Sequence, residues 1–143
     1  MDPRSIKPTG KFLPEVTKER AALGSNIFYL KLSVNGDDIG WLGADTDEWC
    51  VVSDRPIGIT PYFHIHDGRT YYHNQAGWWL SVRRGSVGFY KNWNDATSWR
   101  IEGKAFISEH NGQALSIYVL NEMYQYIYAW DEYIRLDVEW QEQ

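Results

Sequence analysis

The stretches HNQAGWWLS at residues 73–81 and HNGQALS at 110–116 decide the fold, because they are two copies of one pattern. Each copy places a polar turn before an apolar run that contains a leucine. A third copy, in the first part of the chain, has Leu42 where the other two have Leu80 and Leu115. These leucines are 38 and then 35 residues apart, and a recurring spacing of this size indicates repeated structural units.

A second feature recurs with the leucines. Each leucine is followed, after 21, 19 and 21 residues, by an apolar residue that is expected to open the last strand of its unit: Phe63, Trp99 and Leu136. We expect the three leucines to form one buried layer around a pseudo-threefold axis. The three later residues are expected to form another.

Short runs rich in Val, Ile, Tyr, Trp and Phe continue from Asn26 to the end of the chain. Turn sequences such as Asn-Gly, Asp-Gly and Arg-Gly separate them, as is typical of strands joined by tight turns. The expected strands cover residues 28–34, 39–44, 48–53, 62–66, 70–74, 78–82, 87–93, 98–103, 105–110, 114–119, 125–130 and 134–140. Three four-stranded units without helices predict an all-β fold, the β-trefoil, in which a six-stranded barrel is capped by three hairpins.

The chain divides into an arm and one domain. Prolines interrupt residues 1–25, where only residues 15–23 have a helix-forming composition. We expect this N-terminal arm to precede a β-trefoil domain at 26–143. The three repeats of that domain are expected at about 26–68, 69–104 and 105–143.

Composition narrows the classes of function. Eight Trp and ten Tyr exceed the needs of a core this small, and these residues are enriched at binding faces. A net charge of −5, without clustered Lys and Arg, argues against a nucleic-acid partner. The single cysteine, Cys50, excludes an intramolecular disulfide, and we expect its thiol to be buried.

The N-terminal residues lack the apolar region of a signal peptide, and no apolar run approaches the length of a membrane span. We therefore expect a cytoplasmic protein, or one exported without a conventional signal peptide. No membrane insertion by this domain is expected.

The repeats resemble those of the β-trefoil superfamily, most nearly the ricin-B-type lectins, over residues 26–140. Units of that family carry Leu-x-x-Asp on the second strand, and LGAD at 42–45 matches it. They carry an apolar–aromatic pair on the third strand, matched by FY at 89–90 and IY at 127–128. The stretch NDATSW at 94–99 has the spacing of the element entering the fourth strand, with Thr and Ser where the family has Gln.

This resemblance implies a carbohydrate-binding protein, a lectin, whose partners are glycans or glycoconjugates. Arg83 and Tyr118 stand where the second and third units of the family would have the aspartate. The galactose preference of the family is therefore not implied, and a fascin-like or other trefoil stays an alternative.

A saccharide offers a flat face of C–H groups and a rim of hydroxyls, so its site needs an aromatic platform beside Asp, Asn or Arg. Each unit has such a combination, which predicts up to three weak sites that act together on a multivalent glycan. The candidate ligand-binding residues are Asp45 and Trp49, near Asp47 and Asp54, in the first unit; Arg83, Tyr90, Asn92, Trp93, Asn94 and Asp95 in the second; and Tyr118, Tyr128, Trp130 and Asp131 in the third.

Other functions stay open. A protein-binding trefoil, such as a protease inhibitor, would use the segment 53–61, with Ile57 and Ile59 as its contact residues. The chain could also be the recognition part of a toxin or scaffold, or a homo-oligomer. No enzyme motif is present, so we expect no catalytic residue, no cofactor and no metal, although His64 and His66 share a strand face.

Overall fold

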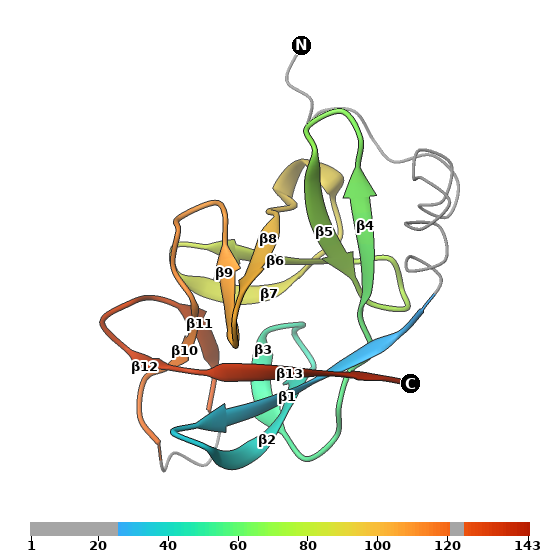
Figure 1. The fold of residues 1–143 in the computed structure, drawn as a ribbon. Coiled ribbons are helices and arrows are strands. Elements are labelled where there is room, and N and C mark those ends of the chain that lie inside the picture. Colours follow the sequence, from blue (N-terminus) through green and yellow to red (C-terminus); the bar gives the residue numbers. More distant parts are fainter. Residues whose placement is uncertain (1–25, 121–124) are drawn as a thin grey trace.

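The computed structural model describes residues 26–120 and 125–143, and this part of the chain is all-β, as predicted (Figure 1). Within these ranges, helical structure is limited to a 3-10 turn, η2, at Trp93–Asp95. None of the described residues form an apolar helix of membrane-spanning length. The expected arm at 1–25, with its helix at 15–23, lies outside the described residues.

The strands follow the expected runs. They are β1 (Phe28–Val34), β2 (Asp37–Ala44), β3 (Cys50–Ser53), β4 (Thr60–His64), β5 (Arg69–His73), β6 (Trp79–Arg83), β7 (Ser86–Tyr90), β8 (Trp99–Glu102), β9 (Ala105–Ser108), β10 (Leu115–Ile117), β11 (Ile127–Ala129), β12 (Ile134–Arg135) and β13 (Asp137–Glu142). Each of the twelve expected runs overlaps a strand, and the last run divides at Leu136 into β12 and β13.

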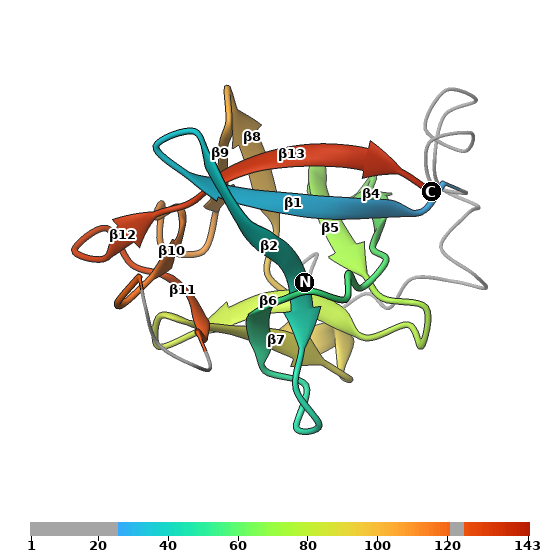
Figure 2. The same ribbon diagram turned by 90° about the horizontal axis from the view of Figure 1, so that it is seen from below.

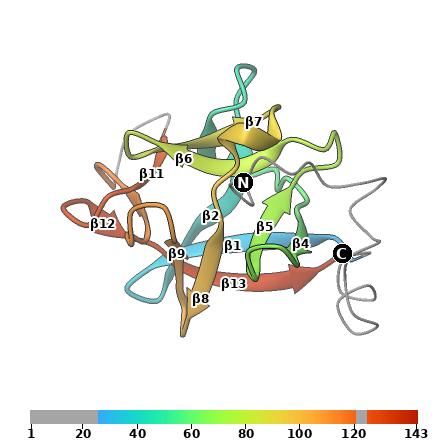
Figure 3. The same ribbon diagram turned by 90° about the horizontal axis from the view of Figure 1, so that it is seen from above.

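These strands belong to three antiparallel sheets. The first has the order β13-β1-β2-β3, so β1 and β13, from opposite ends of the described chain, lie side by side (Figure 2). The second has the order β12-β10-β11-β7-β6-β5-β4, and the third is the β8–β9 hairpin (Figure 3). The described strands therefore do not form the single closed barrel that the β-trefoil prediction implies.

Further backbone hydrogen bonds join the sheets to one another. Phe28 of β1 and Ile59, just before β4, exchange two bonds of 2.8 and 2.9 Å. The N–H of Val138 on β13 donates to the carbonyl of Lys104, in the β8–β9 turn, at 2.8 Å. Each sheet is thus fixed to another by main-chain groups as well as by side-chain packing.

Three hairpins meet through one repeated contact. They are β2–β3, β6–β7 and β10–β11. The hydrogen bonds between them run from Phe89 N–H to the Glu48 carbonyl (2.8 Å), from Ala129 N–H to the Gly85 carbonyl (2.8 Å) and from Val52 N–H to the Gln125 carbonyl (2.9 Å). Each hairpin supplies one acceptor and, four residues later, one donor, and the third hairpin returns to the first. The three contacts therefore form a cycle.

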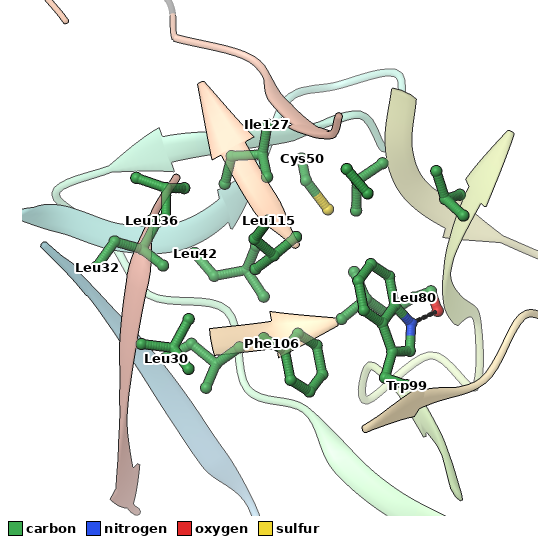
Figure 4. Packing of buried hydrophobic residues seen from close by; sticks show 14 of the residues in the cluster. Leu30, Leu32, Leu42, Cys50, Leu80, Trp99, Phe106, Leu115, Ile127 and Leu136 are labelled. Carbon is green, nitrogen blue, oxygen red and sulfur yellow. Dashed lines mark hydrogen bonds between the residues drawn. The ribbon is translucent and has the colours of Figure 1, made fainter. Parts of the chain in front are cut away.

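The leucines of the repeat lie together in one core, as predicted. Leu42, Leu80 and Leu115 are fully buried and face the same interior (Figure 4). Each leucine carbonyl also accepts a hydrogen bond from the later part of its own unit. The donors are Ile57 N–H (2.9 Å), Trp99 Nε1–H (2.7 Å) and Leu136 N–H (2.9 Å).

The prediction of a second buried layer is correct for two of its three residues. Trp99 and Leu136 are buried in the main core, but Phe63 is only partly buried and does not belong to it. Ile59, four residues earlier, is the fully buried core residue of this segment. The chain enters the core there because Ile59 is the residue that hydrogen-bonds to β1.

A second, smaller cluster is almost entirely aromatic. Its buried members are Tyr62, Tyr71, Trp79, Trp93 and Ala96. His64 is buried beside them, and its Nδ1 lies 3.1 Å from the Tyr62 hydroxyl. This cluster accounts for part of the aromatic surplus in the composition, which therefore does not all lie at the surface.

Cys50 is fully buried in the main core, as expected. Burial raises the pKa of its thiol well above the ordinary value, and the nearby Glu48 carboxylate adds to the effect. The thiol is therefore protonated near neutral pH and packs as a small apolar side chain.

Candidate functional site

A pocket opens where the three hairpins meet. Its volume is about 370 Å³, and small-molecule sites commonly measure roughly 300–1,000 Å³. All three hairpins line it, with Asp45, Asp47 and Trp49 from the β2–β3 turn, Ser86 and Val87 from β7, and Tyr126, Ile127 and Tyr128 from the third hairpin. No single sequence repeat could form this pocket alone.

The walls of the pocket follow from the cyclic contact between hairpins. The residue after each acceptor carbonyl is Trp49 in the first hairpin, Ser86 in the second and Tyr126 in the third. All three line the pocket. Trp49 and Tyr126 expose 37% and 42% of their surface, whereas the second hairpin has only a serine at this place. Because serine is much smaller than an aromatic residue, the pocket has open space beside Ser86.

Gly88 allows Trp49 to lie against β7. The two residues form an antiparallel bridge, and a Cβ at position 88 would be 3.0 Å from Trp49 Cε3 and 3.0 Å from the Glu48 carbonyl oxygen. The indole also meets the ring of Tyr90 edge-on, with the ring centroids 6.2 Å apart. The backbone of Gly88 and the ring of Tyr90 thus both hold the Trp49 indole in place.

Asp45 organises the turn that carries Trp49. Its Oδ1 accepts hydrogen bonds from the N–H groups of Asp47 (2.9 Å) and Trp49 (3.0 Å). A hydrogen bond from the Tyr126 hydroxyl to Asp45 raises the pKa of that phenol, and the charge of the carboxylate adds to the shift. Asp45 therefore links the first hairpin to the third and positions both aromatic walls.

The predicted residues of the second unit form a different place on the surface. Arg83 forms an ion pair with Asp95 at 2.7 Å, and its guanidinium lies 5.0 Å from the centre of the Tyr90 ring. Burial raises the pKa of Tyr90. A separate pocket of about 290 Å³ is lined by Val82, Arg83, Arg84, Asn94, Asp95, Thr97 and His110. Its charged groups are mostly basic, unlike those of the pocket between the hairpins.

The prediction that Trp93 forms a platform for a ligand at the surface is wrong, because Trp93 is a core residue. Its side chain is only 3% exposed and belongs to the smaller aromatic cluster. Its ring centroid lies 4.6 Å from that of Tyr71 and 4.8 Å from that of Trp79. Asn92 is exposed just before η2 and lines neither of the two pockets.

In the third unit, only Tyr128 of the predicted residues lines the pocket between the hairpins. Tyr118 is highly exposed and packs on Tyr133, with ring centroids 5.0 Å apart. Trp130 lies against the β6–β7 turn, and the N–H of Asp131 donates to Oε1 of Gln113, between β9 and β10, at 2.7 Å. The structure therefore does not gather the third-unit candidates into one site.

Four residues that line the pocket were not among the predicted candidates: Ser86, Val87, Tyr126 and Ile127. Tyr126 could have been predicted from the sequence, because residues two apart on a strand share a face and Tyr128 was already a candidate. Nothing in the local sequence marks Ser86. Its role depends on contacts between hairpins that are far apart along the chain.

The segment 53–61 does not project as an inhibitor loop would. Only Asp54 and Arg55 are exposed in it. Ile57 packs against the main core and Ile59 is fully buried. Ile59 is therefore not accessible to a partner and Ile57 is only partly accessible, which differs from the expectation for this segment.

The described residues offer no evident metal site, since no group of three His, Cys, Asp or Glu side chains comes together among them. No protein-family model, curated protein or solved structure matches the chain. The geometry of the pocket is therefore the basis for assigning a function.

Proposed function

We propose that the described chain is a β-trefoil with pseudo-threefold symmetry. The cyclic hydrogen bonds among the three hairpins support this architecture, because one acceptor–donor rule applies at all three contacts. The buried leucines support it too, since each lies at the same place in its unit and each carbonyl accepts a bond from the later part of that unit. The strand number is compatible with it, because β1 to β13 make twelve strands, or three units of four, when β12 and β13 are counted as one divided strand.

We propose further that the protein is a lectin, a carbohydrate-binding protein without enzymatic activity, and that its saccharide occupies the pocket between the hairpins. One observation carries this proposal: two part-exposed aromatic side chains and two carboxylates line a single pocket of sugar-accommodating size. The faces of Trp49 and Tyr126 suit the C–H groups of a pyranose, and the carboxylates suit its hydroxyls.

The pocket favours one binding site per chain instead of three. Its three hairpins each contribute a wall, and Ser86 alone among the equivalent positions leaves space. Elsewhere, the predicted ligands are engaged differently, as Trp93 is in the core and Arg83 is in an ion pair. Avidity from repeated sites within the chain is therefore not part of this proposal.

The role proposed for Asp45 also differs from that of a galactose ligand in ricin-type lectins. One of its oxygens already accepts two backbone N–H groups, and Tyr126 donates to its carboxylate. Asp45 therefore acts by positioning Trp49 and Tyr126. Asp47, which is exposed at the same pocket, is the better placed direct ligand.

A glycan array probed with the wild-type protein and with Trp49→Ala tests the proposal. We expect the wild type to bind at least one class of saccharide above background. Removing the indole should weaken that binding about thirtyfold, because a central aromatic contact is commonly worth about 2 kcal/mol.

The matched control is Trp130→Ala, since Trp130 is 39% exposed but does not line the pocket. This variant should bind like the wild type. An array without signal for the wild type, or equal losses in both variants, would rule out a lectin site at this pocket.

A further inference from the structure

We propose that the pocket between the hairpins selects a sugar that carries a free, protonated amino group over the corresponding neutral and acidic sugars. This inference rests on the proposed function and adds the chemical class of the ligand to it. The distinguishing group is an ammonium substituent on the saccharide, as in a hexosamine.

The first argument is the charge of the lining. Asp45 and Asp47 contribute carboxylates, and none of the Lys, Arg and His residues in the described part of the chain lines this pocket. Neither carboxylate forms an ion pair with a Lys or Arg of the described residues. An acidic sugar would therefore meet like charge, whereas an ammonium group would meet opposite charge.

The second argument is the way the two carboxylates are held. Asp45 is engaged by the turn and by Tyr126, so its position is fixed. The same bond to the Asp47 N–H fixes the backbone that carries the second carboxylate. Asp47 is exposed, so its side chain is available to a cation at the mouth of the pocket. A ligand that pairs with Asp47 needs little reordering of the turn.

The third argument is the aromatic character of the other walls. Trp49, Tyr126 and Tyr128 line the same pocket. Aromatic faces attract cations as well as C–H groups, and carboxylates beside them strengthen the attraction. The ring of an amino sugar and its ammonium group would thus both find suitable partners.

Titration calorimetry on the full chain tests the preference with two matched series of methyl glycosides. One series is glucosamine, glucose and glucuronic acid, and the other is galactosamine, galactose and galacturonic acid. In at least one series, we expect the protonated amino sugar to bind about three- to fivefold more tightly than the neutral sugar, as suits a partly exposed ion pair. The acidic sugar should bind most weakly. At a pH where the amine is neutral, the advantage should disappear.

Two variants identify the residue responsible. Asp47→Asn should abolish the preference, so that this variant binds the amino sugar no more tightly than the neutral sugar. Asp54→Asn makes the same change of net charge at an exposed position outside the pocket lining, and it should preserve the preference.

The possible results separate this inference from the proposed function. Equal affinities for amino and neutral sugars, both sensitive to Trp49→Ala, overturn the inference and leave the lectin site standing. Tetramethylammonium binding as tightly as the amino sugar, with the same dependence on Asp47, shows that the sugar ring is not recognised and overturns both. No Trp49-dependent binding of any of these probes also counts against both.

Discussion

Replacing Trp99 with alanine is expected to lower the free energy of unfolding by about 3–5 kcal/mol, as large-to-small changes of buried aromatic residues do. The side chain is 1% exposed and stacks on Phe106, with ring centroids 4.7 Å apart and an angle of 2° between the rings. Its indole N–H also donates to the Leu80 carbonyl at 2.7 Å. Urea unfolding followed by circular dichroism measures the change.

Two further variants separate the causes of this loss. Trp99→Phe keeps an aromatic ring but leaves the buried Leu80 carbonyl without its donor, so it should cost about 1–3 kcal/mol. Trp130→Ala removes a part-exposed indole outside the core and should cost far less. If Trp99→Ala were no more destabilising than Trp130→Ala, the packing described around the leucines would be wrong.

Replacing Ser86 with tyrosine should weaken saccharide binding at least about a hundredfold, because the new side chain would occupy the space a ligand needs. Ser86 occupies in the second hairpin the pocket-lining position that Trp49 and Tyr126 occupy in the other two. A tyrosine there would give each hairpin an aromatic residue at the equivalent place. Binding is measured by calorimetry with the saccharide that gives the strongest array signal.

The fold should tolerate this change. Ser86 is the first residue of β7 and is only partly buried. Tyrosine is also a favourable residue in strands. The free energy of unfolding should therefore stay within about 0.5 kcal/mol of the wild type. The control Ser86→Ala keeps the pocket open and should retain binding. Undiminished binding by a folded Ser86→Tyr variant would place the ligand elsewhere.

Much of the fold could be predicted because its signals are local and repeated. Turn residues punctuate the strands, and the leucine of each unit stands at a fixed place after a polar turn. Its spacing from Leu42 predicts Phe63 as the buried anchor of the first unit, and this prediction is wrong. The buried residue is Ile59, because the position at which the chain enters the core depends on pairing with β1. Such long-range pairing leaves no mark in the local sequence.

The site was less predictable, since it is built between the units and not within them. Asp45 and Trp49 were predicted for a site in the first unit and Tyr128 for a site in the third, yet all three line one pocket. Composition counts aromatic residues but does not distinguish a part-exposed indole such as Trp49 from a buried one such as Trp93. That distinction depends on which strands pack against each ring.

The number of saccharides bound per chain distinguishes one pocket shared by the hairpins from separate sites on the repeats. Calorimetry with a monovalent sugar at concentrations that saturate the protein gives this number. We predict a stoichiometry of one, because all three hairpins contribute to a single pocket. Two or three equivalent sites per chain would contradict it and would assign binding to the separate repeats.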